Sequence, residues 1–226
     1  GFLGPVTSAG AKRVKLIPNG ADPSMFDPND DGAIFRQSNK LNDKFVALYA
    51  GAHGMSNDLN VILESASLLA DMKNIQIVLL GDGKEKPTLM AQAKEMKLSN
   101  VTFLPSVPKT EMASALAGAD ACIAILKPLE EYKTTYPNKV FDYMAAGRPV
   151  VLAIDGVIRE VVESADCGIF AAPGNTEEVA EAIRKLAANP EQSRAMGLKG
   201  RKYLEENFSR AVIGEKLVKL LKELTG

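Results

Sequence analysis

The sequence predicts an α/β fold in which a doubly wound parallel sheet carries helices on both faces. From Phe45 onward, short apolar runs alternate with longer amphipathic stretches, which is typical of parallel strands that helices bury on both sides. Right-handed crossovers between successive strands then place helices on both faces of the sheet. Ligands of such sheets bind at the carboxyl ends of the strands, so polar residues that directly follow a strand are the first candidates for a site.

A connector that contains a hinge is expected at residues 1–42, ahead of a domain at residues 43–226. Residues 1–13 carry glycine and proline without hydrophobic periodicity, which predicts a tail. Residues 14–17 form a short apolar run that favours a strand, and the turn residues after it end that strand. Residues 27–42 are rich in Asp, Asn, Gly and Ser, so we expect a surface loop with one helical turn.

The domain at residues 43–226 is expected to contain six strands and eight helices, the last of them a C-terminal group. The strands are predicted at 45–51, 75–80, 101–104, 120–125, 149–153 and 168–171. The helices are predicted at 58–71, 84–97, 109–118, 138–146, 157–164, 176–188, 191–206 and 209–224. The final helix repeats apolar residues along one face, so we expect it either to pack on its own domain or to leave part of that face uncovered.

The composition argues against several classes of function. The formal net charge is −1, so the chain offers no excess of basic residues for nucleic-acid binding. No apolar run approaches the roughly 20 residues of a membrane span. Cys122 and Cys167 lie in apolar contexts, so we expect buried free thiols in a reducing, cytoplasmic compartment. His53 is the single histidine and no C-x-x-C occurs, so no metal site is expected. The sequence starts at Gly1 and shows no signal-peptide pattern, so we expect a processed or cut chain.

Residues 136–151, YPNKVFDYMAAGRPVV, carry the strongest local signal. Pro137 is expected at the first helical position, and Gly147 in the Gly-Arg-Pro sequence ends the helix. The free N–H groups and the positive dipole end of the first turn, together with Lys139, suit a phosphate group. One turn further on, the Asp142 carboxylate has acceptor oxygens that suit a vicinal diol such as a ribose. The alternative is an exposed helix on which Lys139 and Asp142 form a pair worth about 0.2–0.5 kcal/mol.

The same stretch resembles the signature of the family-4 retaining glycosyltransferases, in the branch whose helix begins with Pro-(Ser/Asn)-Lys. The residues that carry the resemblance are Pro137, Asn138, Lys139, Phe141, Asp142, Met144, Ala145, Gly147, Pro149 and Val150. The resemblance implies a GT-B fold, of which this chain would be the Rossmann-like half that binds a nucleotide-sugar donor through Pro137, Asn138, Lys139 and Asp142. Residues 17–22 resemble the hinge of the same family, so the chain would begin just before the hinge and lack the N-terminal acceptor half.

The donor-site candidates that follow the first strand are Gly51, His53 and Gly54. Two glycines there let backbone approach a ligand closely, although a tight strand–helix turn is the commoner reason for such a pattern. In the family this loop lies near the diphosphate and the transferred sugar. His53 is therefore expected either to be a structural or surface residue, which is the commoner case, or to hydrogen-bond the sugar or the β-phosphate. Many members carry two cations where this chain has Ala52 and Asn57, so Lys139 would carry more of the charge neutralisation.

Two further loops supply candidates at the nucleotide end of the site. Gly81 and Gly83 form a G-x-G turn, which borders the nucleotide pocket in the family. For Asp82 between them, an ordinary turn without a role in binding is nearly as good an explanation. After the third strand, the family presents backbone groups to the base, at the places of Leu104, Ser106 and Val107. Backbone groups can pair with the imide edge of uracil, and a small pocket excludes purines, so UDP is the expected nucleotide.

One position departs from the family in a way that leaves the transferred sugar open. Much of the family has two glutamates separated by seven residues, and here the second falls on Asp142 and the first on Thr134, which carries no charge. In the family the first glutamate contacts the transferred sugar. Thr134 stays among the donor-binding candidates, and the other candidates for sugar contact are Glu130, Glu131, Lys133 and Thr135.

The resemblance implies transfer of a sugar from a nucleotide-sugar to a saccharide or lipid-linked acceptor, with retention at the anomeric carbon. Lys139 and the helix start would stabilise charge on the departing diphosphate, and no cofactor or metal is expected. The acceptor half would be the missing partner, with any peripheral contact to the cytoplasmic membrane face, so the chain alone is expected to bind nucleotide and turn over little. The alternatives are a UDP-sugar epimerase, a phosphorylase of the same fold, and a non-catalytic nucleotide-binding or scaffold module.

Overall fold

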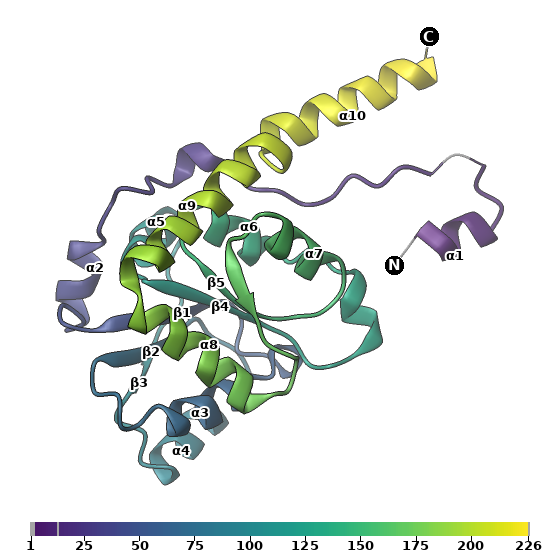
Figure 1. The fold of residues 1–226 in the computed structure, drawn as a ribbon. Helices are drawn as coiled ribbons and strands as arrows, with labels where there is room; N and C mark the ends of the chain where they lie inside the picture. The colour runs from purple at the N-terminus through teal and green to yellow at the C-terminus, as the bar shows by residue number, and fades with distance from the viewer. Residues whose placement is uncertain (1–2, 13, 226) are drawn as a thin grey trace.

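The computed structural model describes residues 3–12 and 14–225, and its centre is one six-stranded parallel sheet (Figure 1). The strands are β1 (Phe45–Ala50), β2 (Ile75–Leu80), β3 (Val101–Leu104), β4 (Ala121–Ile125), β5 (Val150–Ala153) and β6 (Gly168–Phe170). Their order across the sheet is β3-β2-β1-β4-β5-β6, so the chain winds outward from β1 in both directions. The predicted doubly wound parallel sheet is confirmed, and each strand lies within about one residue of its predicted bounds.

Helices surround this sheet, joined by three short 3-10 turns. The helices are α1 (Leu3–Ser8), α2 (Ala33–Ser38), α3 (Leu59–Leu68), α4 (Lys86–Glu95), α5 (Lys109–Ala117), α6 (Asn138–Ala145), α7 (Val157–Ser164), α8 (Thr176–Ala188), α9 (Pro190–Asn207) and α10 (Arg210–Thr225). The 3-10 turns are η1 (Pro23–Met25), η2 (Met55–Asn57) and η3 (Glu130–Thr134). All eight helices predicted for the domain are present. The 3-10 turns were not predicted, because three to five residues are too few to show a periodicity.

The side chains of each strand alternate between two apolar cores, one on each face of the sheet. In β1, Val46 and Leu48 belong to the core beneath α5, α6, α7 and α9. Ala47 and Tyr49 belong to the core beneath α3, α4 and α8. Every residue of β1 and β2 is buried, as a parallel sheet with helices on both faces requires. Both cysteines are free and buried, as predicted.

Helix α6 begins at the carboxyl edge of the sheet and ends on a glycine. Pro137 stands at the N-cap, with φ −66° and ψ 125°, and its extended ψ keeps it outside the helix, so the prediction of a first helical position was wrong by one residue. At the other end Gly147 adopts φ 66°, and the N–H groups of Gly147 and Arg148 donate to the carbonyls of Met144 and Tyr143, both at 3.0 Å. This Schellman motif confirms the predicted glycine stop.

The connector differs from its prediction in two places. The tail contains the short helix α1, and residues 14–17 are irregular instead of forming a strand. The sheet ends at β3 and β6, so residues 14–17 pair with neither edge, and a lone apolar run does not make a strand. The chain meets the domain at Ala21, which forms a single parallel bridge with Ser209, and Asn19 donates to the carbonyl of Tyr136 at 2.8 Å. The predicted hinge segment therefore touches the start of α6.

Helix α10 extends beyond the rest of the helices, and its C-terminal part lies away from the sheet in Figure 1. Leu217, Val218 and Leu221 on this helix are half-exposed. Part of the apolar face of the final helix is thus uncovered, which is one of the two expected outcomes. Within residues 3–12 and 14–225, no helix combines the length and the apolar character that crossing a membrane requires.

Candidate functional site

The candidate site lies at the carboxyl ends of β1, β2 and β4, where α6 begins. Lys139, in the first turn of α6, is partly buried, and its ammonium donates to the Tyr49 hydroxyl at 3.0 Å and to Asn57 Oδ1 at 3.2 Å. The same nitrogen lies over the Tyr49 ring, 4.3 Å from its centroid. Burial lowers the pKa of Lys139 to about 8, so the side chain is mostly charged at neutral pH and loses its charge just above it.

The loop after β1 is built to accommodate this lysine. A Cβ on Gly51 would lie 3.0 Å from the Lys139 ammonium, so glycine at this place leaves room for the side chain. The Tyr49 hydroxyl donates to the carbonyl of Ala52 at 2.8 Å, and Asn57 Nδ2 donates to the same carbonyl at 3.0 Å. The two residues that hold the lysine therefore also hold the loop.

His53 is buried and neutral, and it does not face solvent as a ligand contact would. Its backbone N–H donates to the carbonyl of Asp82 at 2.8 Å, and its ring lies between those of Tyr49 and Phe103. Burial, and then the charge of Lys86, lower the pKa of His53. Neither ring nitrogen has a hydrogen-bond partner among the described residues. For the His53 ring to hydrogen-bond a bound nucleotide-sugar, the loops that cover the ring would have to separate.

The glycines of the G-x-G turn allow two loops to pack backbone against backbone. A Cβ on Gly81 would lie 1.9 Å from the carbonyl oxygen of Gly51, and one on Gly83 would lie 2.3 Å from that of His53. Gly81 and Gly83 are therefore required by the contact between the loops after β1 and β2. Gly54 is different, because an added Cβ would come no closer than 3.8 Å to another residue.

The loop after β3 offers fewer free groups than the sequence predicted. The Leu104 carbonyl accepts from the Gly81 N–H at 3.2 Å and from the Lys86 ammonium at 2.9 Å, which uses both of its lone pairs. No hydrogen bond in the described part of the chain uses the backbone N–H of Ser106 or Val107. Ser106 is exposed, and Val107 lines a groove of about 410 Å³ between α2 and α5. Of the three candidates, Ser106 and Val107 can pair with a base.

Asp142 and Lys139 do not form the ion pair that an exposed helix would favour. Within the described residues no salt bridge joins them, and the charges that act on Asp142 are those of Lys109 and Arg210. Burial raises the pKa of Asp142. Asn138 is exposed in the first turn of α6. The two charged side chains of α6, Lys139 and Asp142, therefore lie in separate surroundings, and the alternative interpretation of this helix loses its main contact.

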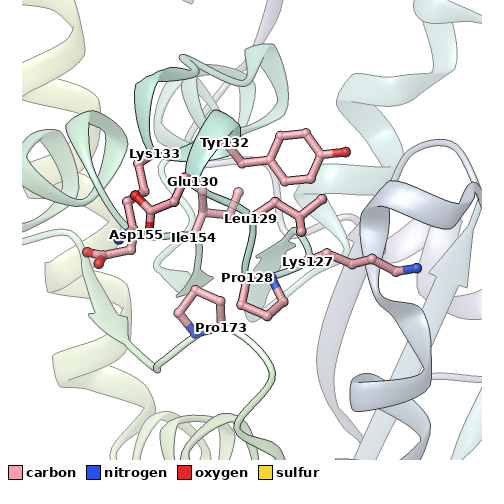
Figure 2. A pocket seen from close by; sticks show the side chains of 9 residues that line it. All are labelled: Lys127, Pro128, Leu129, Glu130, Tyr132, Lys133, Ile154, Asp155 and Pro173. Carbon is pink, nitrogen blue, oxygen red and sulfur yellow. Dashed lines mark hydrogen bonds and ion pairs between the residues drawn. The ribbon is translucent and has the colours of Figure 1, made fainter.

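A second hollow lies beside the site, at the carboxyl ends of β4 and β5, and Figure 2 shows its side chains. Its volume is about 260 Å³, with an apolar wall and charged groups at its rim. The lining residues are Lys127, Pro128, Leu129, Glu130, Tyr132, Lys133, Ile154, Asp155 and Pro173. Lys133 pairs with Glu130 at 2.6 Å, so two predicted sugar contacts lie here. The Thr134 hydroxyl instead donates to the carbonyl of Glu131 at 3.1 Å, and Thr134 does not line the hollow.

Sequence reasoning missed three residues that shape the site. Tyr49 supports Lys139, and Lys86 joins the loops after β2 and β3 through Gly81 O at 2.7 Å and Leu104 O at 2.9 Å. Tyr143 in α6 is buried, and its hydroxyl accepts from the N–H of Ala50 at 3.1 Å, which ties α6 to the end of β1. A tyrosine within an otherwise apolar run was the available signal, because a buried hydroxyl needs a partner.

Neither metal ligands nor reactive thiols gather around the site. The described residues include no group of three or more His, Cys, Asp and Glu side chains that could hold a metal ion. Burial raises the pKa of the Cys167 thiol to about 12 and also raises that of Cys122. Both cysteines are therefore protonated at neutral pH, and the polar chemistry of the site rests on Lys139, Asp142 and backbone groups.

Comparison with known sequences identifies relatives of this chain. The family profile described as "Glycosyl transferases group 1" matches residues 30–203. The D-inositol 3-phosphate glycosyltransferase of Segniliparus rotundus is 24% identical over 206 residues, which cover 88% of this chain and 45% of that protein. The GDP-mannose-dependent monoacylated alpha-(1-6)-phosphatidylinositol monomannoside mannosyltransferase of Corynebacterium glutamicum is 24% identical over 215 residues, covering 91% of this chain and 55% of that protein. The chain spans about half the length of these curated relatives.

Solved structures resemble the chain over almost all of its length. HepE of Anabaena, in complex with UDP, superposes with a TM-score of 0.85 at 19% identity and covers 96% of this chain and 60% of that one. Sucrose-phosphate synthase of Thermosynechococcus elongatus superposes with a TM-score of 0.81 at 21% identity, covering 95% of this chain and 53% of that one. At these identities the likeness establishes the fold.

Proposed function

The chain belongs to the group 1 glycosyl transferases, and we propose that it is the nucleotide-sugar-binding half of a retaining glycosyltransferase. This membership confirms the resemblance to family 4 and its GT-B fold. The observation that carries this proposal is the position of Lys139. Its ammonium lies at the N-terminus of α6, beside the glycine loop after β1. A helix start and a lysine at the carboxyl edge of a parallel sheet together suit a diphosphate.

In the proposed reaction, this chain mainly stabilises the negative charge of the leaving diphosphate. Negative charge grows on the β-phosphate oxygens as the bond to the anomeric carbon breaks. The Lys139 ammonium and the first N–H groups of α6 favour that charge, and charge-assisted bonds of this kind are worth about 1.5–3 kcal/mol each. Since the charge is larger in the transition state than in the bound donor, this contact would raise the rate as well as the affinity.

The remaining groups of the site would hold the nucleoside. We assign the ribose hydroxyls to the Asp142 carboxylate, one turn into α6, and the base to Ser106 and Val107 in the loop after β3. UDP in the HepE structure supports uracil as the base, whereas GDP-mannose in the name of the Corynebacterium relative supports guanine. We favour UDP, because the loop offers backbone groups that match an imide edge.

The acceptor would be bound by an N-terminal half that this chain does not contain. We infer a saccharide or lipid-linked acceptor, and a cytoplasmic reaction in which any membrane contact is made by that half. The chain matches about half of its relatives' length, which supports this division. We therefore expect the chain alone to bind donor and to transfer little sugar.

Thermal melting with UDP, GDP, dTDP and CDP tests the donor assignment. A nucleotide at about ten times its dissociation constant should stabilise the chain by about 1.4 kcal/mol, which raises the Tm by roughly 3–6 °C. Lys139→Met and Asp142→Asn should both abolish the shift. Lys199→Met is the matched control, because Lys199 is an exposed lysine that pairs with Asp166 on another surface. No shift with any nucleotide, or equal shifts in all variants, would contradict the proposal.

One observation favours a second candidate, a non-catalytic nucleotide-binding module. Thr134 has no charge where much of the family has a glutamate, and its hydroxyl is engaged within its own turn. Such a module would bind UDP through Lys139 and show no transfer even when the N-terminal half is present. Assaying the longer protein with a donor and an acceptor mixture separates the two candidates, since transfer that Lys139→Met abolishes excludes the module.

A further inference from the structure

We propose that Tyr49 and Asn57 are positioning residues for Lys139, whose ammonium they hold through neutral hydrogen bonds. This inference rests on the proposed function, because the ligand toward which they position the ammonium is the donor diphosphate. Four residues carry it, Tyr49, Ala52, Asn57 and Lys139, and they form one closed ring of hydrogen bonds, named here the lysine ring.

The lysine ring closes on a single carbonyl. The Lys139 ammonium donates to the Tyr49 hydroxyl at 3.0 Å and to Asn57 Oδ1 at 3.2 Å. The Tyr49 hydroxyl and Asn57 Nδ2 then both donate to the carbonyl of Ala52, at 2.8 Å and 3.0 Å. Every side chain in the ring is thus fixed by two partners, so the position of the ammonium is coupled to the position of the loop.

The geometry leaves the lysine able to bind an anion. An ammonium has three N–H groups, and the lysine ring uses two of them, so the third can donate to a phosphate oxygen. Gly51 lies next to the ammonium, where a side chain would crowd it at 3.0 Å. Both partners are neutral, because burial raises the pKa of Tyr49 and an asparagine carries no charge. The positive charge therefore remains available to the diphosphate.

The neighbouring titratable groups do not compensate this charge. From the loop after β1, His53 is neutral, and the Lys86 charge from α4 lowers its pKa while Asp82 opposes that effect. On α6 itself, Asp142 responds to Lys109 and Arg210. Beyond η2, burial raises the pKa of Asp58, the charge of Lys127 lowers it, and the charge of Glu64 raises it. Burial lowers the pKa of Lys139 to about 8.

Proton uptake makes the role of the lysine ring measurable. At about pH 8 roughly half of the chains carry a neutral Lys139, and a bound diphosphate restores the charged form, so binding should take up roughly half a proton. A carboxylate at position 57 would keep Lys139 charged and leave no proton to take up. Loss of the amide oxygen would favour the neutral form and raise the uptake toward one proton.

Calorimetric titration with UDP at about pH 8, in buffers of different ionisation enthalpy, tests this. We expect Asn57→Asp to take up almost no proton, and Asn57→Ala and Tyr49→Phe to take up more than the native chain. Each of these variants should bind UDP roughly three- to tenfold more weakly than the native chain. Relative to the native chain, proton uptake should fall in Asn57→Asp and rise in the other two variants, as expected if the residues position a charge. A general loosening of the loop would weaken UDP binding but change proton uptake equally in all three variants.

Asn207→Ala is the matched control, because Asn207 Nδ2 also donates to a backbone carbonyl, that of Tyr203, at 3.0 Å. It should bind UDP and take up protons like the native chain. Unchanged affinity, or equal proton uptake in Asn57→Asp and Asn57→Ala, would overturn the positioning role while leaving the proposed function in place. Absence of UDP binding by the native chain would overturn both.

Discussion

The loops that follow β1 and β4 end at the same edge of the sheet, yet they are built in opposite ways. The loop at residues 51–58 packs its backbone against the turn after β2, and it contains the buried His53. The loop at residues 127–136 has no buried residue, half of its residues are exposed, and Lys133 pairs with Glu130 on the surface. The first loop is held by close backbone contacts at Gly51 and His53, and the second by contacts that water can replace.

This difference divides the proposed donor site into a rigid part and an adaptable part. The rigid loop supports Lys139, which needs a fixed position to stabilise developing charge. The adaptable loop lines the hollow of Figure 2 and includes the candidates for sugar contact. The two loops touch at Ser56, whose hydroxyl bonds to Tyr132 at 2.8 Å and whose carbonyl accepts from the N–H of Lys127 at 3.0 Å. Outside this joint, residues of the adaptable loop can vary without disturbing the phosphate contact.

The largest expected effect compares one glycine beneath each loop. Gly81→Ala would force a Cβ to 1.9 Å from the Gly51 carbonyl oxygen, and Gly156→Ala would force one to 1.9 Å from that of Lys133. Both residues have positive φ, 147° and 88°. We expect Gly81→Ala to lower the free energy of unfolding by about 3 kcal/mol, and Gly156→Ala by about 1–2 kcal/mol, because the exposed loop can move aside. Urea denaturation measures both.

Gly54→Ala is the control within the rigid loop, because its φ of −115° suits any residue and an added Cβ meets nothing closer than 3.8 Å. It should change the free energy of unfolding by less than about 0.5 kcal/mol. UDP binding should be lost in Gly81→Ala and retained in Gly156→Ala. A larger loss of stability in Gly156→Ala than in Gly81→Ala would reverse the comparison of the two loops.

A smaller effect should appear in the pH dependence of stability. Lys139 has a pKa of about 8 when folded, below its unfolded value of about 10.4, so the unfolded chain binds more protons between those values. Stability should therefore rise with pH through this window, by about 2 kcal/mol between about pH 7.5 and about pH 9.5. Lys139→Met should remove this part of the rise, as paired urea titrations at the two pH values would measure. Parallel slopes in both proteins would mean that the rigid loop does not bury the charge.

Much of the fold could be predicted because each element carries its own signal. Short continuous apolar runs mark the strands, and an apolar period of 3.6 residues marks the helices, so α7 and α8 have their predicted bounds. The end of α6 was predictable because Gly147 can adopt the left-handed conformation that its turn requires. The carboxyl edge of the sheet then brought Gly51, Gly81 and Lys139 together, as the topology predicts.

The contacts within the site could not be predicted, because they depend on which side chains meet across the chain. Lys139 and Tyr49 are separated by 90 positions, and no local pattern reports their hydrogen bond. Gly81 was associated with a ligand, whereas its packing against Gly51 is the contact that requires glycine. Residues 14–17 failed as a strand for the same reason, since a strand needs a partner that its own sequence does not specify.

The smallest expected effect concerns the adaptable loop. The side chains of Lys133 and Glu130 are 45% and 84% exposed. Water can therefore replace their ion pair with little change in the free energy of unfolding. We expect Lys133→Ala and Glu130→Ala each to move the Tm by less than about 1 °C, because solvent screens such pairs. Asn57→Ala, in the rigid loop, should lower the Tm more than either, since it breaks the bonds to Lys139 and Ala52. A drop in Tm for Lys133→Ala that equals the drop for Asn57→Ala would show that both loops are held equally firmly. The sugar contacts would then belong to a rigid site, and a change of sugar would require changes in the sheet beneath it.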